Sequence, residues 1–320
     1  MNSFAMLTND EGTVSTARAG KMLRELYGMS SRIQITPLRQ DECTWFGVRD
    51  GSSARQMLRV SEFGRRTQAE MESEIVWIAE LAHDTELLIP RPVAGRSGGY
   101  VQTLGAPGEP DGGVCVLFSL PETALIGCGS GGQHRVYRQL GEIAAMLHQN
   151  ALLWDAGEKL SRRTLPYDSI LTRRPAERTD TLFSSDILPG LLVHAAETVR
   201  RRLSRYSRTE DRFGLIHGAL HPEILLSMGE RVGVLDFDAC EFGWFLYDFA
   251  ISADGVSWEH LPAATSSWLD GYRSKRKISR REAQMLPSFV MLRRLEQLAA
   301  DPACMGATAS FASSYLRDFG

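Results

Sequence analysis

The segment Phe213–Ala250 constrains the fold more than any other part of this 320-residue chain. Apolar residues on either side of a Met-Gly-Glu turn predict a β-hairpin with strands at 224–226 and 231–235. A polar His-Gly-Ala-Leu-His sequence precedes this hairpin, and an Asp-Phe-Asp sequence follows it. Because the two ends of a hairpin lie at one edge, we expect these two polar loops to meet there.

Two loops at one edge of a hairpin are typical of phosphoryl-transfer sites. In such sites an acid in the first loop accepts the proton of the attacking hydroxyl, and an asparagine five residues later holds a metal ion. A second acid, after the hairpin, holds the metal that bridges the phosphates. The spacing of the loops in this chain fits that arrangement.

These motifs resemble the aminoglycoside phosphotransferase and choline kinase-like family, especially its homoserine-kinase-like and stress-response-kinase-like branches. The family's loop reads His-Gly-Asp-x-His-x-x-Asn, and a hairpin, an Ile/Leu-Asp-Phe sequence, a glycine and a Tyr-Asp-Leu-Ala sequence follow it. The positions of this chain that match are His217, Gly218, His221, Asp236, Phe237, Gly243, Tyr247, Asp248 and Ala250.

The resemblance, which runs from about Ile33 to about Ala300, implies an α+β, protein-kinase-like fold. Such a fold has two lobes, a small mixed α/β N-lobe that binds the nucleotide and a larger, mostly helical C-lobe. We expect an N-terminal helical extension over residues 1–32, the N-lobe over 33–122 and the C-lobe over 123–320. Apolar spacings of three and four residues predict helices over 16–27, 67–82, 133–149 and 187–206, and again over the last fifty residues.

Two positions depart from the family's pattern, and both carry chemistry. Ala219 stands where the family has its catalytic aspartate, and Ile224 stands where it has the metal-binding asparagine. A methyl group accepts no proton, and an isoleucine side chain offers no oxygen to Mg²⁺. Asp236, with help from Asp238, remains as the expected metal ligand. The loss of a general base typically costs about 10² to 10⁴ in rate.

Other side chains near the loops are candidates to replace the lost groups. Glu223, His221 and Asp238 lie within five residues of a lost or retained site position and would serve as base or ligand. The alternative for His217 and His221 is that they hold the shape of the loop through hydrogen bonds to its backbone. For Asp248 we expect a loop-bracing carboxylate rather than direct chemistry.

The expected N-lobe supplies candidates for binding a nucleotide. Arg59 stands where kinase-like lobes place a strand cation on the nucleotide phosphates, and Glu74, on the following helix, is placed to pair with it. The apolar run that contains Phe118, Ser119 and Leu120 resembles the strand that joins the family's two lobes, whose backbone would hydrogen-bond an adenine. No glycine-rich phosphate loop is evident in the first lobe.

Charge, hydropathy and cysteine spacing exclude several classes of protein. The 36 basic and 39 acidic residues leave a formal charge of -3, so no global basic field can hold nucleic acid or an anionic membrane. No apolar run is long enough to span a bilayer, and the first twenty residues do not resemble a secretory signal. The scattered cysteines contain no C-x-x-C pair and predict reduced thiols. We therefore expect a cytoplasmic protein that binds neither nucleic acid nor a membrane.

Two further stretches suggest binding but have plainer interpretations. The glycine-rich stretch 127–132 lacks the Gly-Lys-Ser/Thr ending of a phosphate loop and predicts a flexible connector. Arg200, Arg201, Arg202 and Arg205 lie on the outer face of the helix predicted over 187–206. They form either a partner-binding patch or, with the acidic residues around them, a solvated face.

The substituted loop favours a pseudokinase, a kinase-like protein that acts as a regulatory, scaffold or substrate- or peptide-binding subunit in a biosynthetic complex. Its partner would be a protein or a peptide, and its cleft would hold a small molecule or ATP with Mg²⁺. The alternative is an active ATP-dependent O-phosphotransferase that acts on the hydroxyl of a small molecule or peptide through a substituted catalytic apparatus.

Overall fold

The structure is a computed structural model. It describes residues 14–40, 43–51, 55–107, 109, 112–121, 125–126, 132–154, 160–165, 167 and 190–320. Backbone contacts divide the chain into two compact units. The first consists of residues 1–127 and 225–238, and the second consists of residues 128–224 and 239–320. This division differs from the predicted boundaries because the N-terminal helix and the 225–238 hairpin both belong to the first unit.

The first unit contains a larger antiparallel sheet of six strands and a smaller sheet of three strands. Its larger sheet has the strand order β1-β2-β3-β6-β4, with β5 also paired to β6, and the smaller has the order β10-β9-β7. Its elements are α1 (Thr16–Tyr27), β1 (Gln34–Gln40), β2 (Thr44–Arg49), β3 (Gln56–Ser61), α2 (Gln68–Asp84), β4 (Arg91–Val93), β5 (Gln102–Leu104), β6 (Gly113–Ser119), β7 (Leu125–Ile126), β9 (Leu225–Met228) and β10 (Arg231–Val234).

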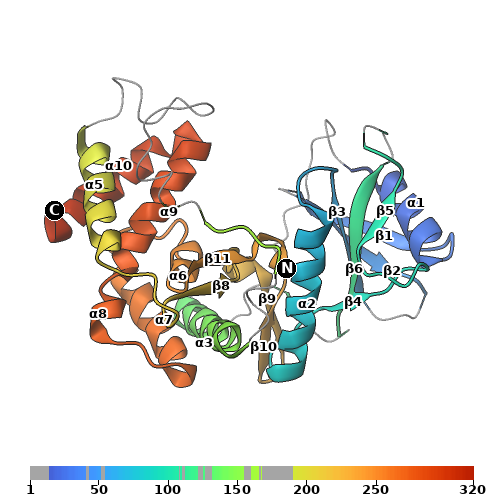
Figure 1. Cartoon of the computed structure of the whole chain (residues 1–320), viewed down its shortest axis with the longest axis horizontal. Helices are drawn as coiled ribbons and strands as arrows, with labels where there is room; N and C mark the ends of the chain where they lie inside the picture. Colours follow the sequence, from blue (N-terminus) through green and yellow to red (C-terminus); the bar gives the residue numbers. More distant parts are fainter. Residues whose placement is uncertain are drawn as a thin grey trace. The chain divides into compact units, whose positions relative to one another are not determined.

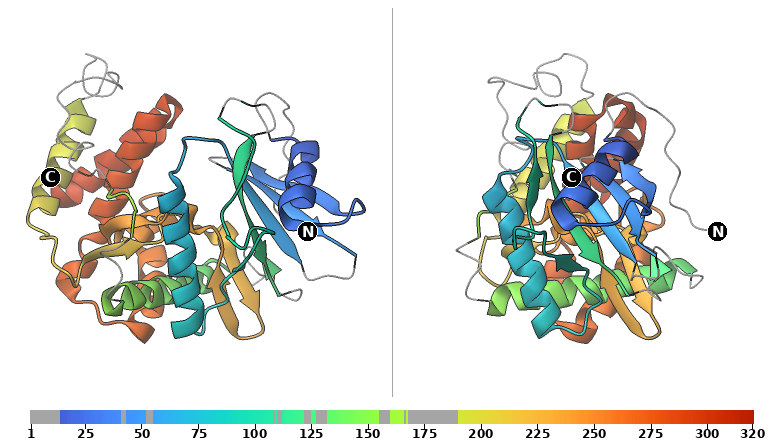
Figure 2. Two further views of the ribbon diagram at one scale, coloured as in Figure 1. Left: turned by 45° about the vertical axis from the view of Figure 1, so that its right-hand side comes forward. Right: turned by 90° about the vertical axis from the view of Figure 1, so that its right-hand side faces the viewer.

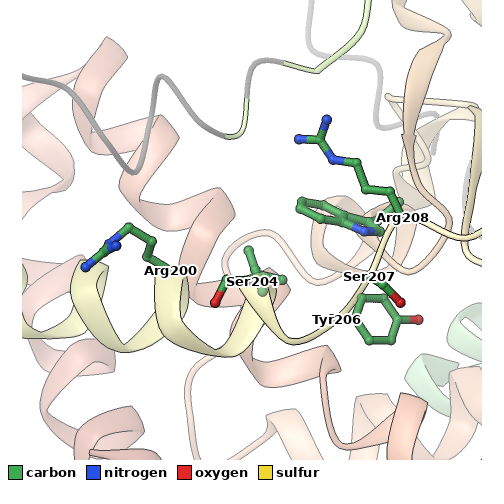
Figure 3. Close-up of a pocket in the computed structure, with 7 residues that line it drawn as sticks. Arg200, Ser204, Tyr206, Ser207 and Arg208 are labelled. Atoms are coloured by element: carbon green, nitrogen blue, oxygen red, sulfur yellow. The ribbon is translucent and has the colours of Figure 1, made fainter.

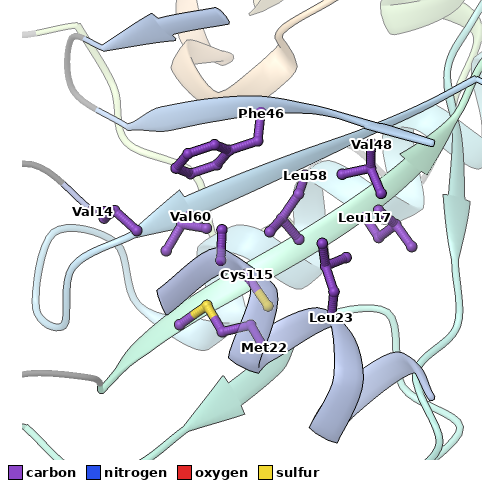
Figure 4. Packing of buried hydrophobic residues seen from close by; sticks show 10 residues of the cluster. Val14, Met22, Leu23, Phe46, Val48, Leu58, Val60, Cys115 and Leu117 are labelled. Atoms are coloured by element: carbon purple, nitrogen blue, oxygen red, sulfur yellow. The ribbon is translucent and has the colours of Figure 1, made fainter. Parts of the chain in front are cut away.

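The two faces of the larger sheet bury different kinds of side chain. Phe46, Leu58 and Leu117 lie opposite one another on β2, β3 and β6, so they share one face. Met22 and Leu23 of α1 pack against this face, and all five side chains belong to one buried cluster (Figure 4). Helix α2 lies on the other side of the sheet, as the views in Figures 1 and 2 show.

Both helices of the first unit have well-defined ends. Helix α1 begins after Ser15, whose side chain accepts a hydrogen bond from the Arg18 amide, and it ends at Gly28 in the left-handed conformation. Helix α2 begins with a capping box in which Thr67 and Glu70 satisfy each other's backbone amides. The helix predicted over 16–27 is therefore confirmed, and the one predicted over 67–82 extends two residues further.

The hairpin of β9 and β10 contacts the N-terminal part of the chain through its backbone. The Leu88 amide donates to the Val232 carbonyl at 2.9 Å, and the Val234 amide donates to the Leu88 carbonyl at 3.2 Å. A Cβ atom on Gly233 would lie 1.9 Å from the Leu88 carbonyl oxygen, so only glycine allows this approach. These contacts place the predicted hairpin in the first unit.

The second unit is mostly helical, as the sequence predicts. Its elements are α3 (Gly132–Leu153), α5 (Gly190–Ser204), β8 (Phe213–Ile216), β11 (Glu241–Trp244), α6 (Tyr247–Ser252), α7 (Leu261–Lys275), α8 (Arg280–Ala283), α9 (Leu286–Ala300) and α10 (Met305–Phe319). Most of the predicted glycine connector, residues 127–131, lies outside the described residues. Among the described residues, no helix combines the length and the apolar character that crossing a bilayer requires.

Helices α3 and α7 make an unusually close approach within the second unit (Figure 1). Glycines stand on both helices where they meet. A Cβ atom on Gly141 of α3 would lie 2.0 Å from the Trp268 carbonyl oxygen, and one on Gly271 of α7 would lie 1.8 Å from the Arg138 carbonyl oxygen. The absence of side chains at these two positions therefore sets the separation of the helices.

We expect Gly271→Ala to destabilise the protein by about 1–3 kcal/mol, because the added methyl group overpacks the α3–α7 contact. Gly306→Ala is the matched control on α10. A Cβ atom there meets nothing within 4 Å, and the change should stabilise the helix by about 0.5–1 kcal/mol. Equilibrium unfolding in urea measures both effects. Equal stability of the two variants would contradict the close-packing account.

Candidate functional site

A wholly buried ion pair joins the sheet of the first unit to α2. The guanidinium of Arg59 donates two parallel hydrogen bonds to the carboxylate of Glu74, with Nη1–Oε1 at 2.7 Å and Nη2–Oε2 at 2.8 Å. Neither side chain is exposed to solvent. Burial alone would lower the pKa of Arg59, but the charges of Glu74 and Asp238 raise it well above its usual value. The structure thus brings the two residues of the predicted pair together, with both groups charged.

Strand register places a second arginine on the same face of the sheet as Arg59. Trp45 on β2 lies opposite Arg59 on one side and opposite Arg39 of β1 on the other. Directly opposed residues point to the same face of an antiparallel sheet. The register of β1 shifts at Leu38, and such bulges re-aim the side chains next to them. The bulge therefore lies directly beside Arg39, at the end of β1.

Both carboxylates of the Asp-Phe-Asp sequence lie against arginines. Asp236 Oδ2 accepts a hydrogen bond from Arg39 Nη1 at 3.0 Å. Asp238 lies 3.5 Å from Arg59 Nη1 and 3.8 Å from Arg66 Nε. Asp236 also has a φ of 63°, and among the described residues it is the only non-glycine with a positive φ. Such backbone strain often marks a functional position.

This donor set does not fit a preformed site for the two metal ions of a kinase. Asp236 and Asp238 already form ion pairs with guanidinium groups of the same unit. In the part of the chain that the structure describes, no group of three or more His, Cys, Asp or Glu side chains is placed to hold a metal ion. Arginine nitrogens lie 3.0–3.8 Å from these two carboxylates.

An apolar pocket opens beside Asp236 in the same unit. It is lined by Trp45, Met57, Ile78, Pro90, Phe118, Leu235, Asp236 and Phe237. The rings of Trp45 and Phe118 are nearly parallel, with centroids 5.9 Å apart. The volume of the pocket, about 10 Å³, holds no more than about one water molecule, so an aromatic base could enter only if its walls moved apart. The sequence analysis did not identify Trp45, although aromatic residues in a predicted strand were a visible signal.

The backbone groups predicted to contact adenine take part in other hydrogen bonds here. Phe118 and Ser119 belong to β6, which pairs with β3 on one side and β4 on the other. The amide of Leu120 donates to the carbonyl of Arg55 at 2.9 Å. In this structure the side chain of Phe118 therefore lines the pocket, while the Leu120 amide is already hydrogen-bonded to the backbone carbonyl of Arg55.

The loop that resembles the catalytic loop lies in the second unit, and a buried carboxylate holds its shape. Asp248 accepts hydrogen bonds from the amides of His217 at 3.1 Å and Gly218 at 2.9 Å. Gly218 has a φ of 76°, and a Cβ atom there would lie 2.2 Å from the Ala239 carbonyl oxygen. The ring of His217 accepts a bond from the Ala219 amide at 3.3 Å. This geometry agrees with the expected bracing roles of Asp248 and His217.

A chain of buried polar groups supports Asp248 from behind. His148 lies 3.0 Å from Asp248 through Nε2 and 3.0 Å from the Tyr272 hydroxyl through Nδ1, and Arg276 donates to that hydroxyl. Burial lowers the pKa of His148. Burial would raise the pKa of Asp248, but hydrogen bonds from His148 and the Gly218 amide hold it below its usual value. These shifts favour a neutral imidazole at His148 and an ionised carboxylate at Asp248.

The loop lacks a carboxylate at its centre. Ala219 is 9% exposed, and its carbonyl accepts a hydrogen bond from the His221 amide at 2.8 Å. Glu223 is exposed and lies with Ile224 in a short 3-10 helix, Pro222–Ile224, of the same unit. Asp238, the third candidate replacement, belongs to the first unit and is held by two arginines. Glu223 and His221 are thus the candidates that accompany the loop within its own unit.

Two glutamates next to this loop escaped the sequence analysis. Glu241 of β11 lies opposite Ile216, the last residue of β8 before the loop. Glu296 of α9 accepts a hydrogen bond from the Tyr247 hydroxyl and lies 3.7 Å from Arg293. Burial, with the nearby charge of Glu241, raises the pKa of Glu296 to about 8. Glu296 is distant in sequence from the loop, so no local sequence pattern predicts that it lies near Tyr247.

A second pocket lies beside the end of α5 in the second unit (Figure 3). Its lining is Arg200, Leu203, Ser204, Tyr206, Ser207, Arg208 and Trp244. Of the predicted arginine patch, Arg200 lines this pocket, while Arg202 donates to Ser288 at 2.7 Å and stacks on the Phe319 ring at 4.2 Å. Part of the predicted patch therefore has a packing role.

We expect Asp248→Asn to lower the free energy of unfolding by about 2–4 kcal/mol at pH 7, because it removes a buried charged acceptor from two loop amides and His148. The folded-state pKa of Asp248 lies below its ordinary 3.8. Its contribution is therefore complete above that value and is lost as the pH falls through the lowered pKa.

Urea unfolding between about pH 3 and pH 7 should show the wild type and Asp248→Asn converging at the acid end. Asp270→Asn, an exposed acid on α7, is the control and should stay within about 0.5 kcal/mol of wild type. A constant difference over the whole pH range would contradict the bracing role of an ionised Asp248.

Comparison with known proteins places this geometry in a family. A microcompartment-associated aminopropanol kinase of known structure is 28% identical, with a TM-score of 0.80 over 96% of this chain and 99% of that one. An amicoumacin kinase in complex with AMP-PNP, Ca²⁺ and Ami is 19% identical, with a TM-score of 0.74 over 94% and 92% of the two chains. These likenesses confirm the α+β, protein-kinase-like fold.

Sequence relatives agree with the structural ones. An uncharacterised protein of Deinococcus radiodurans is 28% identical over 286 residues, which cover 88% of this chain and 80% of the relative. The amicoumacin kinase of Bacillus subtilis is 21% identical over 268 residues, which cover 75% and 71%. The sequence model of the phosphotransferase enzyme family matches residues 13–284 of this chain. With its buried Arg59–Glu74 pair and its braced loop, the chain belongs to the phosphotransferase enzyme family.

Proposed function

We propose that the protein is an ATP-dependent O-phosphotransferase that acts, through a substituted catalytic loop, on the hydroxyl group of a small amine-bearing molecule. The observation that carries this proposal is the buried Arg59–Glu74 pair, with both groups charged and bonded through two hydrogen bonds. Kinase-like lobes use a strand cation and a helix glutamate in this arrangement to organise the nucleotide site. The aromatic side chains of Trp45 and Phe118, which line the small apolar pocket, offer apolar surface on which a base can stack once the pocket opens.

A missing catalytic aspartate lowers the rate of such a reaction without abolishing it. The transition state of phosphoryl transfer is loose, and catalysis consists mostly of positioning and electrostatic stabilisation. The acceptor oxygen forms a bond to the γ-phosphorus while the bond to the β–γ bridging oxygen breaks, which yields ADP and a phosphate monoester. Without a base at Ala219, the hydroxyl proton leaves to water or to a phosphate oxygen. The cost is about 10²–10⁴ in rate.

The acceptor class is suggested by the named relatives and by an acid near the loop. One relative is named as an aminopropanol kinase, and the spectinomycin phosphotransferase and the ethanolamine kinase share the fold. An ammonium group on the acceptor would find the carboxylate of Glu241, which lies on β11 opposite the last residue of β8. An opposite charge near the acceptor favours an amine-bearing molecule over a neutral one.

A second candidate is the pseudokinase function, which the sequence analysis favoured. The replacements at Ala219 and Ile224 are the observations that support it, since they remove a proton acceptor and a metal ligand together. In this case the protein would bind a ligand or a protein partner, such as another biosynthetic enzyme, and change the partner's activity. The named relatives are kinases and favour the transferase instead.

We expect slow transfer of phosphate from ATP to an amino alcohol by the wild type, and a rate higher by about 10²–10⁴ in Ala219→Asp, which restores a general base. Mass spectrometry of the phosphorylated acceptor measures both rates. The matched control is Ala219→Asn, which has the size of aspartate but accepts no proton as a base, and which should stay at the wild-type rate.

The result also separates the two candidates. Product from the wild type, above a reaction without protein, supports the transferase. A silent wild type with an active Ala219→Asp variant would support the pseudokinase, because only the base would then be missing. If neither protein phosphorylates any member of a panel of amino alcohols, the proposed transferase activity is excluded.

We further expect an amino alcohol to be phosphorylated at least about tenfold faster than the matched diol, because one ion pair of about 1.4 kcal/mol changes a rate tenfold. Glu241→Gln keeps the size of this side chain but removes its charge, so the preference should shrink. Competition between the two acceptors in one reaction measures it directly. Equal rates for amine and diol in the wild type would contradict this acceptor class.

A further inference from the structure

The cations of the proposed nucleotide site differ in their access to solvent. Arg59 is wholly buried, so a phosphate cannot reach its guanidinium in this structure. Arg39 is 33% exposed, and its partner Asp236 is 11% exposed. Arg39 is hydrogen-bonded to Asp236, and Asp236 lines the apolar pocket, so this guanidinium lies next to the pocket. Arg39 is thus the guanidinium that an incoming phosphate would meet.

A divalent ion would have to displace this arginine. Mg²⁺ requires oxygen ligands in near-octahedral geometry, and Asp236 Oδ2 already accepts a hydrogen bond from Arg39 at 3.0 Å. Asp238, the other carboxylate of this unit's Asp-Phe-Asp sequence, lies 3.5 Å from Arg59 and 3.8 Å from Arg66. A guanidinium, by contrast, carries its charge permanently and can bind a phosphate through two parallel hydrogen bonds.

We propose that this chain binds the phosphates of its nucleotide through Arg39, without needing a divalent metal ion. The inference rests on the proposed function, because it concerns the nucleotide site of the same protein. Asp236 then orients Arg39 instead of holding a metal. The phosphate shares the guanidinium with Asp236.

Isothermal titration of the full chain with ATP tests this proposal. One titration contains excess EDTA and the other contains excess Mg²⁺. We expect the two dissociation constants to agree within about threefold, a difference of less than 0.7 kcal/mol. In a site organised by metal, removal of Mg²⁺ would weaken binding by tenfold or more, or about 1.4 kcal/mol.

Variants separate the arginine from the metal. Arg39→Gln should weaken ATP binding about tenfold or more in both titrations, since charge-assisted hydrogen bonds to phosphate are lost, and Arg39→Lys should recover part of the loss. Asp236→Asn keeps an oxygen that can accept a hydrogen bond from Arg39 but removes the negative charge that a metal ion would need, so any change in ATP affinity should be the same in EDTA and in Mg²⁺. Arg32→Gln, an exposed arginine before β1, is the control and should bind as wild type does.

Three outcomes would overturn the inference. The first is binding that requires Mg²⁺ and is lost in Asp236→Asn. The second is unchanged affinity in Arg39→Gln when circular dichroism shows that the variant is folded. The third is no ATP binding under either condition. The transfer assay tests the proposed function separately. Metal-independent ATP binding without phosphate transfer would contradict the proposed transferase activity alone. Phosphate transfer together with Mg²⁺-dependent ATP binding would contradict this inference alone.

Discussion

The buried contact between Arg59 and Glu74 sets the arrangement of the first unit. Two fully desolvated charges are stable together only when each satisfies the other, and removal of one partner from such a pair typically costs about 3–5 kcal/mol. The guanidinium of Arg59 also lies near the rings of both Trp45 and Phe118, with its carbon 5.7 Å and 5.8 Å from their centroids. Helix α2, the sheet and the aromatic walls of the pocket are therefore held by one side chain, whose charge extends to Asp238 at 3.5 Å.

A comparable constraint holds the loop of the second unit. The carboxylate of Asp248 receives two backbone amides and His148, and none of these bonds involves the side chains at 219 or 224. The residues that fix the shape of the loop are therefore different from the residues at the two chemically active positions, 219 and 224. The two positions that act on substrate in the family can change without disturbing the geometry, which explains how a chain with Ala219 and Ile224 keeps the family's fold.

The sequence predicted those features that depend on local pattern. Helix α1 lies where the apolar spacing placed it, and the last fifty residues are helical as predicted. These residues form several helices: a capping box of Ser279 and Glu282 begins only the four-residue helix α8, and a separate helix, α9, follows it. Pro287 lies in the first turn of α9, and it lacks the amide that a continuous helix would need there.

Contacts between distant segments could not be read from spacing. Arg39 and Asp236 are 197 residues apart, and His148 and Asp248 are 100 apart. The resemblance to a family pointed to Asp236 as a metal ligand, because in that pattern a cation accompanies the aspartate. In this structure the cation beside Asp236 is the guanidinium of Arg39, which lies beside a register shift in β1 that no local signal marks. The role of Asp236 as a metal ligand stays a prediction.

The central claim is that arginines, rather than metal ions, neutralise the carboxylates of the nucleotide site. A crystal structure of the protein grown with a non-hydrolysable ATP analogue and excess Mn²⁺ tests it most directly, since Mn²⁺ gives an anomalous signal. The account predicts phosphate oxygens about 2.9 Å from the Arg39 guanidinium and no anomalous peak at Asp236. An anomalous peak within coordination distance of Asp236, with Arg39 turned away, would contradict it.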